Sequence, residues 1–119
     1  MHTVLIIDDE KPILDSLFSI LTDEGFRILR ATDGNEGLLV FESEKPDVVL
    51  LDVWMPGMDG LQILSRIKKK DNKAIVIVIS GHGTISTAVE AVKRGAYDFL
   101  EKPLSIEKVL EVIYRGLGL

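Results

Sequence analysis

Two kinds of apolar segment alternate along this chain. Short runs of consecutive apolar residues are typical of strands buried on both faces, and they predict β-strands at residues 4–7, 26–29, 47–53, 74–79 and 97–100. The second run is more polar, as an edge strand can be. Between the runs, apolar residues recur every three or four positions and predict helices over residues 13–21, 33–41, 61–67, 85–92 and 106–113.

Residues that favour helix ends support these boundaries. Pro12 suits the first turn of the first helix, and Gly25 suits the position just past its end. Asp33 and Glu36 are spaced as in a capping box, and Ser105 is a preferred N-cap residue. We expect the fourth helix to turn its apolar stripe toward the core. That stripe consists of Ile85, Ala88, Val89 and Val92.

This alternation predicts an α/β fold. Five successive strand-then-helix units imply a parallel sheet with helices on both faces, joined by right-handed crossovers. The length of 119 residues fits one domain. We expect residues 116–119 to begin a linker, with an output region absent from this sequence.

Composition and charge exclude several classes of protein. Lys and Arg number 14 against 19 Asp and Glu, which gives a net charge of −5 and argues against direct binding of nucleic acid by this domain. The chain has no cysteine and only two histidines, so disulfides, thiolate catalysis and histidine-rich zinc sites are excluded. No apolar run approaches the roughly 18 residues of a membrane span, and the N-terminus does not resemble a signal peptide. The sequence therefore predicts a cytoplasmic protein.

Polar residues gather at the predicted ends of four strands. Asp8 and Asp9 follow the first strand, Asp52 ends the third, Ser80 ends the fourth, and Lys102 follows the fifth. Sites in open parallel sheets form beyond the carboxyl ends of the strands. Carboxylates without soft ligands suit Mg²⁺, while a lysine and a hydroxyl suit phosphoryl oxygens. A carboxylate can also be the nucleophile and form an aspartyl phosphate.

These residues and their surroundings resemble the receiver domain of two-component response regulators. The resemblance covers the whole chain. Its motifs are Asp8-Asp9, then Asp52 within the segment 50–60 (LLDVWMPGMDG), then Ser80-Gly81, then Lys102-Pro103. It implies a flavodoxin-like, doubly wound sheet of strand order 2-1-3-4-5.

The resemblance also implies a role for each site residue. Asp52 accepts a phosphoryl group from a sensor histidine kinase. Asp8, Asp9, Asp52 and the backbone carbonyl of Trp54 hold Mg²⁺. Lys102 contacts the phosphate, and the bond between Lys102 and Pro103 is cis. Ser80 and Phe99 match a hydroxyl–aromatic switch pair. The domain is then a signalling domain that assists its own phosphorylation and dephosphorylation, not an enzyme.

The segment 80–103 is similar to receivers of the nitrogen-regulation type, which implies a role in transcription regulation. Those receivers precede an AAA+ ATPase and a DNA-binding domain. Their fourth helix, fifth strand and fifth helix form a face that pairs two copies or docks on the ATPase. Here that face includes Lys93 and Arg94 and extends to Tyr114, because Val112 and Tyr114 fall off the core stripe of the last helix. His82 is either an exposed loop residue or close enough to the phosphate to tune its hydrolysis.

Two other classes share features of this pattern. A phosphatase of the haloacid-dehalogenase type also uses an aspartyl nucleophile, but places it at the end of the first strand with a second Asp two residues on. Asp8-Asp9-Glu10 lacks that spacing. A flavodoxin-like cofactor-binding module needs a hydroxyl- and glycine-rich loop after the first strand, where this chain has acids that would repel the phosphate of FMN.

Overall fold

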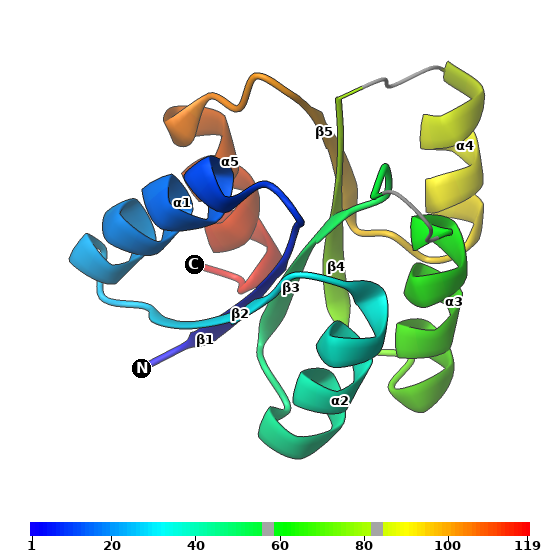
Figure 1. Ribbon diagram of the computed structural model, residues 1–119, viewed down its shortest axis with the longest axis horizontal. Helices are drawn as coiled ribbons and strands as arrows, with labels where there is room; N and C mark the ends of the chain where they lie inside the picture. Colours follow the sequence, from blue (N-terminus) through cyan, green and yellow to red (C-terminus); the bar gives the residue numbers. More distant parts are fainter. Residues whose placement is uncertain (56–58, 82–84) are drawn as a thin grey trace.

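The computed structural model describes residues 1–55, 59–81 and 85–119. In chain order the elements are β1 (Thr3–Ile7), α1 (Lys11–Asp23), β2 (Arg27–Ala31), α2 (Gly34–Glu44), β3 (Val48–Asp52), α3 (Gly60–Lys70), β4 (Ile75–Ser80), α4 (Ile85–Lys93), β5 (Asp98–Glu101) and α5 (Ile106–Gly116). The five strands form one parallel sheet of order β2-β1-β3-β4-β5 (Figure 1). The predicted fold class and strand order are confirmed. The predictions for His82 lie outside the described residues.

The sheet separates two apolar layers. Helices α1 and α5 cover one face, and α2, α3 and α4 cover the other (Figure 1). Within β1, Val4 and Ile6 pack toward α1 and α5, whereas Leu5 and Ile7 pack toward the opposite layer. Successive side chains of a strand point to opposite faces, so a strand covered on both sides must be apolar throughout. This is why the central strands appear in the sequence as continuous apolar runs.

Several element boundaries differ from the predicted ones for local reasons. Phe26 is buried but precedes β2, because its N–H donates to Leu21 O in the turn that closes α1. Gly25 in that turn has a φ of 93°, which a side chain would disfavour. Helix α2 continues past residue 41 to Glu44. Strand β5 runs from Asp98 to Glu101, one residue later than predicted at each end.

The last helix also extends further than predicted. Gly116 is still part of α5, and Leu117 is its C-cap residue. The N–H of Leu119 donates to Tyr114 O at 2.8 Å. Gly116 and Leu117 therefore end α5, and the start of a linker at residues 116–119 stays a prediction.

Two predictions about helix faces are wrong. The stripe of α4 does not pack into the core, because Ile85, Val89 and Val92 are 85%, 47% and 60% exposed. Ala91 is the residue that α4 buries. Conversely, Val112 of α5 is fully buried between the helix and the sheet, although it was expected on an outer face. The spacing of apolar residues along a helix does not by itself show which of them face the sheet.

The carboxyl ends of the strands point to one edge, where the loops after β1, β3, β4 and β5 meet. The bond between Lys102 and Pro103 in the last of these loops is cis, as predicted. Within the described parts of the chain, none of the helices has the length and apolar character needed to cross a membrane.

Candidate functional site

The fold brings the predicted site residues together. Asp52 is the last residue of β3, and Asp8 follows β1 directly; each is only 1% exposed. Ser80 ends β4 and is fully buried. Lys102 follows β5 and reaches Asp8 and Asp52 through its ammonium group. Burying two carboxylates is costly unless they are paired, so their burial at one sheet edge marks a specialised site.

One lysine pairs with three carboxylates. The ammonium nitrogen of Lys102 lies 2.9 Å from Glu10, 3.0 Å from Asp52 and 3.2 Å from Asp8. Burial lowers the pKa of Lys102, but hydrogen bonds to Glu10 and Asp52 outweigh this effect and hold the pKa above its ordinary value. Lys102 is therefore a permanent positive charge beside Asp52.

Among the clustered acids, Asp8 has a carboxyl group whose ionised form is disfavoured by its surroundings. Burial is the main cause that raises the pKa of its carboxyl to about 6, and the nearby charge of Asp52 adds to the effect. Hydrogen bonding from the Glu10 N–H to Asp8 Oδ1 at 2.9 Å, and the charge of Lys102, act in the opposite direction. The compensation is incomplete, so the buried acid is held part of the way toward its neutral form.

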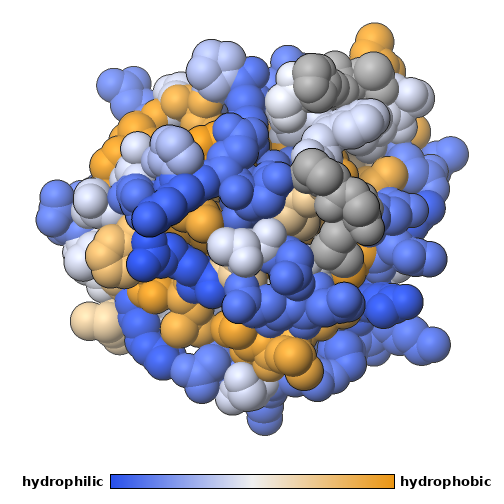
Figure 2. Space-filling view, in the orientation of Figure 1, coloured by the Kyte–Doolittle hydropathy of each residue, from blue (hydrophilic) through white to orange (hydrophobic). Residues whose placement is uncertain are grey.

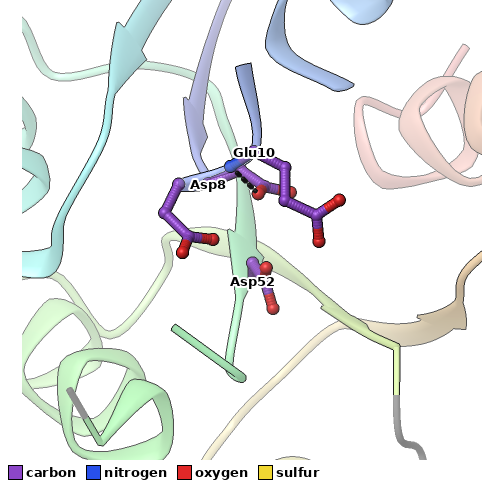
Figure 3. Close-up of side chains that lie close together, drawn as sticks. Asp8, Glu10 and Asp52 are labelled. Carbon is purple, nitrogen blue, oxygen red and sulfur yellow. Dashed lines mark hydrogen bonds between the residues drawn. The ribbon is translucent and has the colours of Figure 1, made fainter. Parts of the chain in front are cut away.

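The donor set suits a divalent cation of the Mg²⁺ type. Carboxylate oxygens of four acids lie within 4.8 Å of one another, with two of the acids buried and two exposed; these are Asp8, Asp9, Glu10 and Asp52. The Oδ2 atom of Asp8 is buried and has no hydrogen-bond partner among the described residues; its 3.2 Å contact with Lys102 is an ion pair without hydrogen-bond geometry. A buried carboxylate oxygen without a hydrogen bond can bind a divalent cation if Lys102 gives up its ion pair with that oxygen. Figure 3 shows that Asp8, Glu10 and Asp52 lie together at the carboxyl ends of β1 and β3.

The remaining predicted residues lie on or next to the same strands, β3, β4 and β5. The backbone N–H of Trp54 donates to Asp52 Oδ1 at 2.8 Å and helps to fix the carboxyl group, while the Trp54 ring is half exposed. The backbone N–H of Lys102 donates to Ser80 O at 2.9 Å, which ties the last two loops together. Phe99 is half-buried on β5 and packs against the α2–α4 layer.

Two residues that contribute to the site were not predicted from the sequence. Glu10 bonds Lys102 across 92 positions of sequence. Its place directly after Asp8 and Asp9 was the available signal. The second is Gly60, because a Cβ atom there would collide with the backbone of Val53, the residue after Asp52. Helix α3 can begin this close to the site only with glycine at that position.

The comparisons with known proteins agree with this geometry. Residues 4–114 match the family model of the response regulator receiver domain. The chain is 42% identical over 118 residues to the nitrogen assimilation regulatory protein NtrX of Azorhizobium caulinodans, an alignment that covers 98% of this chain and 26% of that protein. This chain thus spans about a quarter of that relative's length.

Solved structures give the same result. The receiver domain of NtrX from Brucella abortus superposes with a TM-score of 0.91 at 43% identity, covering 97% of this chain and 98% of that one. The beryllofluoride-activated NtrC4 receiver domain dimer gives a TM-score of 0.94 at 42% identity, covering 99% and 98%. These similarities do not favour the phosphatase or the flavodoxin-like alternative. With buried acids and a lysine at the ends of its strands and a family match over nearly its full length, the chain belongs to the response regulator receiver domains, of the NtrX and NtrC type.

Proposed function

We propose that Asp52 accepts a phosphoryl group from the phosphohistidine of a sensor histidine kinase. The observation that carries this proposal is the buried carboxylate of Asp52, 3.0 Å from the ammonium of Lys102 and beside Asp8. In the step, a carboxylate oxygen of Asp52 attacks phosphorus. The new P–O bond forms as the P–N bond breaks, and the imidazole of the kinase leaves with the electron pair.

The surrounding residues neutralise charge in this step. Asp8, Asp9, Asp52 and the backbone carbonyl of Trp54 would hold Mg²⁺, which supplies positive charge to the phosphoryl oxygens when bound. Lys102 adds a second positive charge at the same oxygens, and the hydroxyl of Ser80 donates a hydrogen bond to one of them. The hard oxygen donors and the unbonded Oδ2 of Asp8 support this assignment.

The chain then acts on itself and not on a separate substrate. The same charges that favour phosphorylation of Asp52 also favour attack of water on the aspartyl phosphate, which regenerates the carboxylate and releases phosphate. We therefore describe the protein as a phosphoacceptor signalling domain that assists its own phosphorylation and dephosphorylation. It binds no nucleic acid directly, in keeping with its net charge of −5.

Phosphorylation would change the face formed by α4, β5 and α5. Ser80 follows the phosphate, and Phe99 moves into the space that Ser80 leaves. The exposed apolar side chains of α4 support this face as the output surface, and Figure 2 shows a hydrophobic projection over the start of that helix. A second copy is the partner we favour, because a related receiver is described as an activated dimer. In a longer protein, the same face would regulate an AAA+ ATPase and a DNA-binding domain, since the NtrX relative is about four times the length of this chain.

Phosphorylation of Asp52 is tested with a small phosphodonor in place of the kinase. The chain is incubated with acetyl phosphate and Mg²⁺, and intact-protein mass spectrometry measures the addition of one phosphoryl group. We expect Asp52→Asn to abolish the addition, and omission of Mg²⁺ to slow it at least about tenfold, because the carboxylates then lack a neutralising cation. The exposed Asp59, whose side chain caps α3, provides the matched control Asp59→Asn. Equal labelling of Asp52→Asn and the parent chain would refute the proposal.

A further inference from the structure

Glu10 makes a contact that the proposed chemistry does not use. Its Oε1 atom accepts a hydrogen bond from the Lys102 ammonium at 2.9 Å, at the solvent-facing end of the cluster. The Glu10 side chain is 55% exposed, whereas that of Lys102 is 12% exposed. The ammonium group thus lies between a buried pair of acids and one acid at the rim.

The backbone on both sides of this contact is fixed. The N–H of Glu10 donates to Asp8 Oδ1, and its carbonyl accepts hydrogen bonds from the first turn of α1. Although Glu10 is the N-cap residue of that helix, its side chain makes no capping hydrogen bond. The backbone of Lys102 is bonded to Ser80. Movement of the ammonium must therefore come from the side chains of Lys102 and Glu10. The Glu10 side chain can move with the ammonium because it is exposed and makes no capping hydrogen bond.

Lys102 occupies the same acids that a divalent cation needs. Its ammonium lies at ion-pair distance from both Asp8 and Asp52, and two cations repel each other when they share buried carboxylates. Cation binding therefore requires Lys102 to give up part of these contacts. A buried ammonium that loses its partners is unfavourable unless another carboxylate receives it.

We propose that Glu10 is a positioning residue that draws the Lys102 ammonium toward the rim and so frees Asp8 and Asp52 for Mg²⁺. This inference rests on the proposed function, since it assumes that the cation and the phosphoryl group enter among these carboxylates. Without the Glu10 carboxylate, Lys102 stays on the buried acids and competes with the cation.

Two simpler roles for Glu10 predict different results. Glu10 lies close enough to the other acids to be a metal ligand itself, or it adds a negative charge that attracts any cation. Neither role needs Lys102, whereas positioning acts only through Lys102. A double-mutant cycle between Glu10 and Lys102 therefore distinguishes the positioning role from the ligand and charge roles.

The cycle consists of the parent chain, Glu10→Gln, Lys102→Met and the double variant. The Mg²⁺ dissociation constant is measured from the emission of Trp54, the only tryptophan, two residues from Asp52. We expect Glu10→Gln to weaken Mg²⁺ binding about threefold to tenfold in the parent chain, within the range of couplings between contacting charged groups. In the Lys102→Met background the same change should alter binding less than about twofold.

Two further variants complete the design. Glu101→Gln removes one negative charge from an exposed residue next to Lys102 that forms no ion pair with it in the described structure. It should leave Mg²⁺ binding within about twofold of the parent. Glu10→Asp keeps the charge but shortens the reach to Lys102, and it should behave more like Glu10→Gln than like the parent chain. Because Glu10 and Glu101 are exposed, Glu10→Gln, Glu10→Asp and Glu101→Gln are expected to keep the melting temperature within a few degrees.

The outcomes distinguish this inference from the proposed function. An equal loss of Mg²⁺ affinity in both backgrounds, or a Mg²⁺ affinity of Glu10→Asp equal to that of the parent chain, would overturn positioning in favour of a ligand or charge role. No effect of Glu10→Gln would overturn it as well. If the parent chain shows no Mg²⁺-dependent phosphorylation at Asp52, the proposed function itself fails.

Discussion

Helices α4 and α5 flank the same edge strand, β5, yet they use their apolar residues in opposite ways. In α5, Val109, Val112 and Ile113 are fully buried against the sheet. In α4, Ala91 is the buried residue, and its larger apolar side chains are exposed. Burial of apolar surface contributes about 25 cal/mol per Å². Helix α5 therefore gains more from its large buried side chains than α4 gains from Ala91, the one residue of α4 that is fully buried. A helix held this weakly can shift at small cost, and an uncovered apolar face can receive a partner.

Matched isoleucines test this difference most directly. Ile113 of α5 is fully buried, and Ile85 of α4 is 85% exposed. We expect Ile113→Ala to lower the free energy of unfolding by about 2–5 kcal/mol, because it leaves a cavity in the core. Ile85→Ala should change it by less than about 0.5 kcal/mol. Urea denaturation of both variants measures the difference, and similar losses would show that α4 is packed as firmly as α5.

The buried acid of the site offers a second test, because it changes global stability without touching either helix. The pKa of Asp8 is raised to about 6 from 3.8, so the folded state binds this proton more tightly than the unfolded state does. The resulting stability is present below about pH 4 and is lost as the pH rises through about 6. In metal-free buffer at pH 7, Asp8→Asn should therefore stabilise the chain by about 2–3 kcal/mol. The gain should vanish near pH 4.

Amide hydrogen exchange then tests whether α4 and α5 open independently of each other. Amides of α5 should exchange only on global unfolding, so Asp8→Asn should slow them by about 10²-fold at pH 7, in line with its effect on stability. Amides of α4 should exchange through local opening and keep their rates. Equal slowing in both helices would contradict the view that α4 opens independently. If Asp8→Asn destabilised the chain at pH 7, this would contradict the inference that the folded state disfavours the ionised form of Asp8.

The sequence predicted the site correctly where the residues with suitable chemistry also fell at the predicted ends of strands. The acids after β1 and β3, with Lys102 after β5, could be predicted to converge because parallel strands end at one edge. The role of Glu10 could not, because its contact with Lys102 depends on side-chain conformations 92 positions apart in sequence. The face of α4 was predicted wrongly for a related reason. Spacing shows that a helix has an apolar stripe, but not whether the fold supplies a surface to cover it.

The more exposed of the two exposed valines of α4 provides the last test, in which the effect on folding should be the smallest. Val92 is 60% exposed, whereas Val112 of α5 is fully buried. Val92→Asp should change the free energy of unfolding by less than about 0.5 kcal/mol, because it leaves no cavity and buries no charge. The same substitution at Val112 would place a charge in the core and prevent folding.

The effect of Val92→Asp should appear in self-association. If two phosphorylated copies pair through α4, β5 and α5, a negative charge on the α4 part of that contact must lose its hydration in both copies. We expect sedimentation to show that the parent chain associates after treatment with beryllofluoride, while Val92→Asp stays monomeric and still accepts a phosphoryl group on Asp52. Unchanged association of Val92→Asp would remove α4 from the dimer contact. The uncovered apolar residues of this helix would then require another partner, whereas those of α5 are already satisfied by the sheet.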